Sequence, residues 1–161
     1  MTLNIVFINK QRKYKLDFDI YKSLVIEFFK NKISKNLFLR REVFLYVSFL
    51  SSKSIKSLKN RVFNLNIKTD VISLPMDTDL LEIENDNDIP MIFGEIFICP
   101  EVAFSQSKKF NNSFNEEMKL LLVHGLLHLI GYDDILEQDI KIMRREEQKF
   151  LTIFKEKEDF N

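Results

Sequence analysis

The strongest constraint on the fold is a nearly continuous apolar segment at residues 120–130, which reads Leu-Leu-Leu-Val-His-Gly-Leu-Leu-His-Leu-Ile. Its eleven residues are too few to cross a bilayer, which takes roughly 18 or more. Acidic residues precede it, and Gly131 follows it, as is typical of the first turn and the end of a helix. We therefore expect a helix that begins after Ser113 or Asn115, ends at Gly131 and is buried on most sides.

The rest of the chain alternates between short apolar runs and segments with helical spacing of apolar residues. The runs predict strands at residues 3–8, 42–50, 71–74 and 91–99, and the spacing predicts helices after Asp19, after Ser51 or Ser52, from Pro100, and over residues 135–154. The sequence predicts an acidic loop at residues 77–88, between the last two strands. With 161 residues and no repeat or linker, the sequence predicts one α+β domain over residues 1–161, a small sheet covered by helices.

Charge is divided unevenly along the chain, although its net value is zero. Residues 1–68 contain 15 Lys and Arg against 4 Asp and Glu, a net charge of +11, and the remaining residues have a net charge of −11. A basic surface of this kind suits phosphate groups, which makes nucleic acid a candidate partner. The alternative is that these charges are an ordinary solvated surface.

Two features bear on cellular location. The single cysteine cannot form an internal disulfide, so the fold does not depend on an oxidising compartment. The first ten residues show neither the basic start nor the cleavage site of a secretory signal. We expect a cytoplasmic protein with no membrane anchor.

The two histidines of the chain lie in the apolar helix, and their spacing predicts a metal site. His124 and His128 are four residues apart and therefore share one helix face, within reach of one ion. Asp134 follows, and a left-handed turn at Gly131 can return it to that face. The pattern H-x3-H-x2-G-x2-D thus predicts a site formed by His124, His128 and Asp134. Asp133 is the alternative ligand, or else a group that hydrogen-bonds a ligand or caps the turn.

Two other interpretations of the histidine pair are weaker. Metzincin proteases share these offsets, but their general base is a Glu directly after the first His, where this chain has Gly125. The histidines could instead simply pack in the core. An imidazole buried without a partner loses its hydration, however, whereas a metal ion would satisfy both rings.

Three motifs together resemble the YbeY endoribonucleases, also called ribosomal RNA maturation factors. Residues 124–133 match the family signature H-G-x-L-H-L-x-G-Y-D-H, and Asp134 stands where the family has its third zinc-binding His. Residues 69–75 (Thr-Asp-Val-Ile-Ser-Leu-Pro) are similar to T-D-V-L-S-F-P, and residues 94–96 (Gly-Glu-Ile) to G-D-I. The similarity covers residues 58–150.

The resemblance implies a mixed, roughly four-stranded sheet and a zinc ion. It also implies single-strand-specific cleavage in ribosomal RNA maturation, including the 3′ end of small-subunit RNA, and a part in ribosome quality control. The expected partners are single-stranded or ribosomal RNA and the small ribosomal subunit. Because Asp134 adds a negative charge, we expect slower hydrolysis near neutral pH or a preference for a harder metal such as manganese.

A family pattern L-N-x-x-Y-R upstream of T-D-V is not matched. Lys59, Val62 and Phe63 stand at its Asn, Tyr and Arg positions, and Arg61 lies close by. The changed ligand and the missing Arg motivate an alternative: a non-catalytic RNA- or ribosome-binding assembly factor with a structural metal. Structural zinc sites usually have four protein ligands, and only three are evident, which favours the enzyme.

Two further groups of residues are candidates for supporting roles. Asp70, Ser73 and Glu95 are expected, with Asp133, to contact the ligands rather than the ion, although turn capping or simple solvation explains them about as well. The cations of the helix before the T-D-V strand could line an RNA groove or form a solvated face; they are Lys53, Lys56, Lys59 and Arg61.

Overall fold

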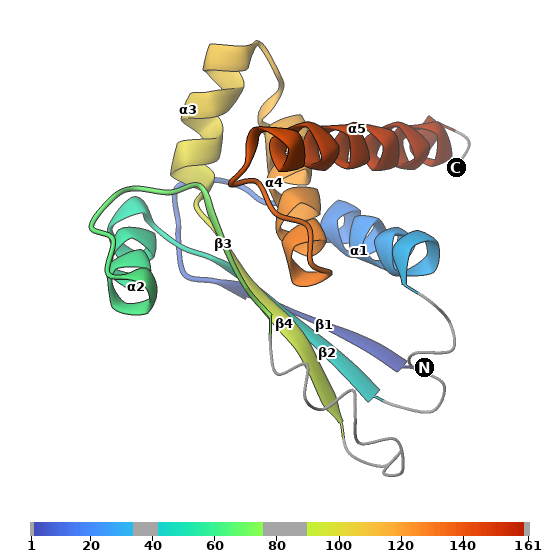
Figure 1. Ribbon diagram of the computed structural model, residues 1–161, viewed down its shortest axis with the longest axis horizontal. Coiled ribbons are helices and arrows are strands. Elements are labelled where there is room, and N and C mark those ends of the chain that lie inside the picture. The colour runs from blue at the N-terminus through green and yellow to red at the C-terminus, as the bar shows by residue number, and fades with distance from the viewer. Residues whose placement is uncertain (1, 34–41, 76–89, 160–161) are drawn as a thin grey trace.

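The computed structural model describes residues 2–33, 42–75 and 90–159 (Figure 1). Over these ranges the chain forms four strands, β1 (Thr2–Asn9), β2 (Glu42–Phe49), β3 (Val71–Pro75) and β4 (Met91–Ile98). It also forms five helices, α1 (Phe18–Lys32), α2 (Ser52–Phe63), α3 (Pro100–Phe110), α4 (Phe114–Leu129) and α5 (Glu137–Asp159). The acidic loop expected at residues 77–88 lies outside the described ranges.

The strands form one mixed sheet in the order β1-β2-β4-β3. β2 pairs in parallel with both β1 and β4, whereas β3 is an antiparallel edge strand beside β4. The expected α+β fold with a four-stranded mixed sheet is therefore confirmed. None of the helices in the described ranges is long and apolar enough to cross a membrane.

One face of the sheet carries the main core. Because side chains alternate between the faces of a strand, every second residue of β2 and β4 points to this face, where Leu45, Val47, Ile96 and Ile98 are fully buried. They share a single cluster with the apolar sides of α1, α4 and α5, and these three helices lie together on one side of the sheet (Figure 1). Helix α4 therefore packs directly on this face of the sheet.

Helix α2 packs on the opposite face, near the β3 edge. Its buried Ile55 contacts a smaller cluster that contains Ile72 and Cys99. Ile72 alternates along β3 with Ser73, which lies against α4. The sheet edge therefore separates α2 from α4.

At three helix ends the structure either differs from the expected residue or selects one of two expected residues. Asp17, not Asp19, caps α1, because its Oδ1 accepts a hydrogen bond from the Ile20 amide at 3.1 Å. Ser113, rather than Asn115, caps α4. The predicted end of the last helix near residue 154 was wrong, since α5 continues to Asp159. Two ion pairs hold its extra turn, Lys157 with Glu27 and Glu158 with Lys119.

Candidate metal centre

The start of α4 is fixed by a reciprocal cap. The Ser113 hydroxyl accepts a hydrogen bond from the Glu116 amide at 3.1 Å, and the Glu116 carboxylate accepts one from the Ser113 amide at 2.7 Å. Such a capping box satisfies two backbone donors that a helix start leaves free. It fixes where α4 begins, and the four-residue spacing of His124 and His128 places both on one face of the helix.

The end of α4 is a Schellman turn, and it returns the chain to the helix. The Gly131 amide donates to the His128 carbonyl at 3.0 Å, and the Tyr132 amide donates to the Leu127 carbonyl at 3.1 Å. Gly131 has a φ of +96°, a conformation that strongly favours glycine. The reversal brings residue 134 back beside the helix, as the sequence predicted.

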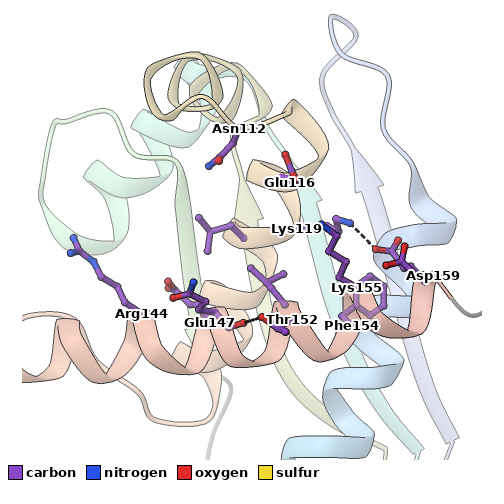
Figure 2. A pocket seen from close by; sticks show the side chains of 13 residues that line it. Asn112, Glu116, Lys119, Arg144, Glu147, Thr152, Phe154, Lys155 and Asp159 are labelled. Atoms are coloured by element: carbon purple, nitrogen blue, oxygen red, sulfur yellow. Dashed lines mark hydrogen bonds and ion pairs between the residues drawn. The ribbon is translucent and has the colours of Figure 1, made fainter.

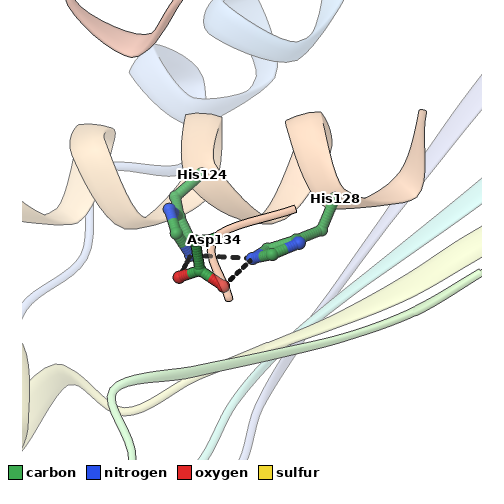
Figure 3. Close-up of side chains that lie close together, drawn as sticks. All are labelled: His124, His128 and Asp134. Carbon is green, nitrogen blue, oxygen red and sulfur yellow. Dashed lines mark hydrogen bonds and ion pairs between the residues drawn. The ribbon is translucent and has the colours of Figure 1, made fainter. Parts of the chain in front are cut away.

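His124, His128 and Asp134 converge on one point (Figure 3). The two Nε2 atoms lie 3.0 Å apart. The Asp134 carboxylate oxygens lie 3.6 Å from Nε2 of His124 and 3.7 Å from Nε2 of His128. Ligands of a tetrahedral zinc with bonds of roughly 2.0–2.1 Å are separated by about 3.3 Å, so the three groups are spaced for one ion.

The partners of the two Nδ1 atoms fix which side of each ring can bind a cation. Nδ1 of His124 lies 2.6 Å from Glu147 Oε1, and Nδ1 of His128 lies 2.9 Å from the Tyr132 carbonyl oxygen. Both partners are pure acceptors, so each Nδ1 carries the hydrogen and each neutral ring offers a lone pair at Nε2. Two lone pairs 3.0 Å apart and a carboxylate repel one another unless a cation lies among them.

The carboxylates around His124 also favour its positively charged form. Burial is the largest single effect and disfavours its charged form, but the hydrogen bond and charge of Glu147, together with the charges of Asp134 and Asp70, outweigh burial. The pKa of His124 is therefore raised above its ordinary value of 6.5. The groups that raise this pKa are carboxylates, which attract any cation near the ring.

Gly125 lets α4 approach the sheet between the two histidines. A Cβ at this position would lie 2.8 Å from Ile96 Cγ2 and 3.0 Å from Ser73 Oγ, closer than packed atoms normally come. The position that holds the general base in metzincins thus faces the sheet. The structure has no room for that Glu.

The aspartates of the turn have different surroundings. Asp133 directs its Oδ1 to the amide of Asp134, which donates to it at 2.7 Å, while the Asp134 carboxylate faces the histidines. Asp133 therefore orients the backbone that presents Asp134.

The remaining expected supporting residues are not all near the triad. Asp70 accepts hydrogen bonds from the Val71 amide at 2.8 Å and from Gln106 Nε2 at 2.7 Å, and it lines the same pocket as His124. Ser73 is beneath α4, and its Oγ is buried with no hydrogen-bond partner among the described residues. Glu95 alternates with Gly94 and Ile96, which contact α4, so it points to the other face of the sheet.

The cations of α2 are not brought to the triad. Lys53, Lys56, Lys59 and Arg61 belong to the helix packed on the opposite face of the sheet. None of them lines the pocket beside His124.

Sequence reasoning missed Glu147, the partner of His124. Its side chain is only 11% exposed and comes from α5, distant from any motif. A signal was present, because Glu147 lies at helical spacing between Met143 and Phe150, both buried. A carboxylate within an apolar stripe requires a buried partner.

A pocket of about 350 Å³ opens beside the triad. His124 and Asp134 contribute to its wall from α4 and the following turn, and Arg144 and Glu147 contribute from α5. Asp70 lines it from the start of β3. The pocket gives a substrate access to the face on which the triad converges.

Comparison with known proteins identifies the family. The family described as Endoribonuclease YbeY matches residues 6–155. The chain belongs to the YbeY family. Two relatives, both named Endoribonuclease YbeY, extend this match over nearly their whole length. The protein of Thermodesulfovibrio yellowstonii is 31% identical over 96% of this chain and 99% of its own. The protein of Staphylococcus saprophyticus is 32% identical over 88% of this chain and 96% of its own.

A solved structure supports the fold. The solution structure of TM1509 from Thermotoga maritima matches with a TM-score of 0.58 and 22% identity, over 93% of this chain and 88% of that one. The YbeY match explains why the motifs at residues 69–75, 94–96 and 124–133 occur together in one chain.

Proposed function

We propose that this YbeY protein is a metal-dependent endoribonuclease that cleaves single-stranded RNA, with His124, His128 and Asp134 holding one divalent ion. The proposal rests on one observation. Two imidazole lone pairs and a carboxylate converge within 3.0–3.7 Å, and the opposite nitrogens are held by acceptors. Family membership supplies the reaction class, endonucleolytic cleavage of RNA.

We propose zinc as the ion, with manganese as the alternative. The separations suit tetrahedral zinc, whereas the carboxylate of Asp134 also suits a harder metal. Among the residues that the structure describes, three groups can act as ligands, and three ligands leave one position open, as in catalytic rather than structural zinc sites. This count favours the enzyme over a binding factor with a structural metal.

In this mechanism the protein's own groups orient the ligands and shape the site. Glu147 and the Tyr132 carbonyl keep the protons on Nδ1, so that both Nε2 atoms stay available. When bound, the ion supplies positive charge that stabilises the phosphodiester transition state and makes the nucleophile more acidic. That nucleophile is either a water molecule or the ribose hydroxyl of the RNA itself.

We further propose that the cellular substrate is ribosomal RNA, with the 3′ end of the small-subunit RNA as the processed site, and that the protein acts in ribosome quality control on the small subunit in the cytoplasm. Support comes from the family motifs and from the net charge of +11 in residues 1–68, which suits a polyanionic partner.

Metal content and RNA cleavage together test the proposal. We expect about one equivalent of metal in freshly purified protein, reduced in His128→Ala and Asp134→Ala. Glu137→Ala is the matched control, because it removes an exposed carboxylate that pairs with Lys141 and leaves the three ligands in place. A labelled single-stranded RNA should be cut by the wild type, and a chelator should stop the reaction.

Two results would contradict the proposal. Cleavage that persists after complete metal removal, with contaminating nucleases excluded, would exclude a metal-dependent reaction. Salt-sensitive RNA binding by the wild type and by His128→Ala, with no turnover, would instead favour the binding-factor alternative.

A further inference from the structure

The lining of the pocket beside the triad is strongly acidic. Four carboxylates line it, contributed by Asp70, Glu117, Asp134 and Glu147. Among the described residues of its lining, Arg144 is the only Lys or Arg. An RNA phosphate that enters this pocket meets net repulsion, which a divalent ion at the triad only partly offsets. Arg144 supplies the remaining local positive charge.

Arg144 is free to bind a ligand. Within the described ranges it makes no hydrogen bond or ion pair, and its side chain is exposed. Its neighbour Arg145 differs, because its Nε lies 3.6 Å from Glu146 Oε1 and its side chain is 71% exposed. Figure 2 shows Arg144 projecting from the same side of α5 as Glu147, and both residues line the pocket that contains His124 and Asp134.

A second, larger pocket adjoins the first. Its volume is about 660 Å³, and both pockets are lined by Leu120, Arg144 and Glu147 (Figure 2). Apolar Leu151 and Phe154 contribute to its lining. Most of the remaining lining is polar or charged and comes from α4 and α5, and it includes Glu116, Lys119, Gln148, Thr152, Lys155, Glu158 and Asp159. Apolar surface beside hydrogen-bonding groups suits a nucleoside, whereas an acidic pocket with one guanidinium suits a single phosphate.

We propose that Arg144 binds a backbone phosphate of the RNA, at the border between the metal-side pocket and a nucleoside subsite in the larger pocket. The inference rests on the proposed function. In this arrangement the substrate strand runs along the groove between α4 and α5. Arginine suits the position because its planar fork can donate two parallel hydrogen bonds to one phosphate.

Binding of a single-stranded RNA to metal-loaded protein tests this directly. The probe is a short fluorescent 2′-O-methyl oligoribonucleotide, shown by gel to remain intact during the titration. The variants are Arg144→Gln and the matched control Arg145→Gln, which removes the same charge one residue away. Arg144→Lys keeps the charge without the fork. Thermal unfolding checks that all three variants are folded.

We expect Arg144→Gln to weaken binding roughly 10-fold, the size of one charge-assisted contact. The slope of log Kd against log salt should fall by about 0.7, the value for one phosphate on a single strand. Arg145→Gln should stay within about twofold of the wild type, and Arg144→Lys should lie between.

Equal effects of Arg144→Gln and Arg145→Gln, or no effect of either, would overturn the inference. Cleavage of unmodified RNA by the wild type is measured separately. Absence of cleavage would refute the proposed function, while the binding titration would still decide whether Arg144 contacts a phosphate.

Discussion

The contact between Glu147 and His124 makes a quantitative prediction about metal affinity. The carboxylate lies 2.6 Å from Nδ1 and is 11% exposed, so solvent screens it little. Loss of such a partner typically weakens metal binding 10- to 100-fold, or about 1.4–2.7 kcal/mol. Glu147→Gln keeps an acceptor for Nδ1 but loses the charge, so we expect about a 10-fold loss. Glu147→Ala loses both and should approach 100-fold.

The assay is competition for zinc against a fluorescent chelator of known affinity. Glu146→Gln is the control, because Glu146 is as buried as Glu147 but pairs with Lys32 instead of a histidine. It should lower stability and leave zinc affinity within about twofold. Wild-type affinity in both Glu147 variants, or an equal loss in Glu146→Gln, would show that the carboxylate does not orient His124.

Three further predictions concern stability. Gly125→Ala places a Cβ 2.8 Å from Ile96 Cγ2 and should lower the free energy of unfolding, measured by urea titration, by about 1–3 kcal/mol. An unchanged free energy would show that α4 can move away from the sheet without loss of stability. The hydrogen bond from Lys32 holds the pKa of Glu146 below its ordinary 4.5, so its contribution is full above that pH and disappears as pH falls through the folded pKa. Urea titrations from pH 6 downward should therefore show a smaller acid-induced loss in Lys32→Met than in the wild type, and equal losses would refute this role for the pair. Chelation should lower the thermal midpoint, by the equivalent of about 2.7 kcal/mol when metal had been present at 100 times its Kd; an equal shift in His128→Ala would show that the effect arises elsewhere.

The spacing of apolar residues predicted most of the secondary structure. Apolar periodicity predicted the four strands and the central turns of all five described helices. In each element, the apolar residues repeat at the spacing of the side that is buried. The convergence of His124, His128 and Asp134 was also predictable, because helix spacing and a glycine turn fix it within a few residues.

The parts that sequence reasoning missed depend on tertiary packing. Glu147 reaches His124 only because α5 packs on α4. The spacing of residues within either helix does not predict which residues of the two helices meet. Glu95 belongs to a matched motif, yet strand alternation points it away from α4. The last turn of α5 is held by ion pairs with α1 and α4, whereas apolar spacing alone predicted that the helix ends near residue 154.

The ending of α4 has a consequence for the order of events in folding. All three candidate ligands lie in an eleven-residue segment, residues 124–134, and the Schellman turn that stops the helix also supplies the carbonyl that orients His128. Closing so short a loop takes tens of nanoseconds, far less than assembling a sheet with parallel strands. The three ligands therefore need only α4 and its turn to converge, whereas Glu147 reaches His124 only once α5 has docked.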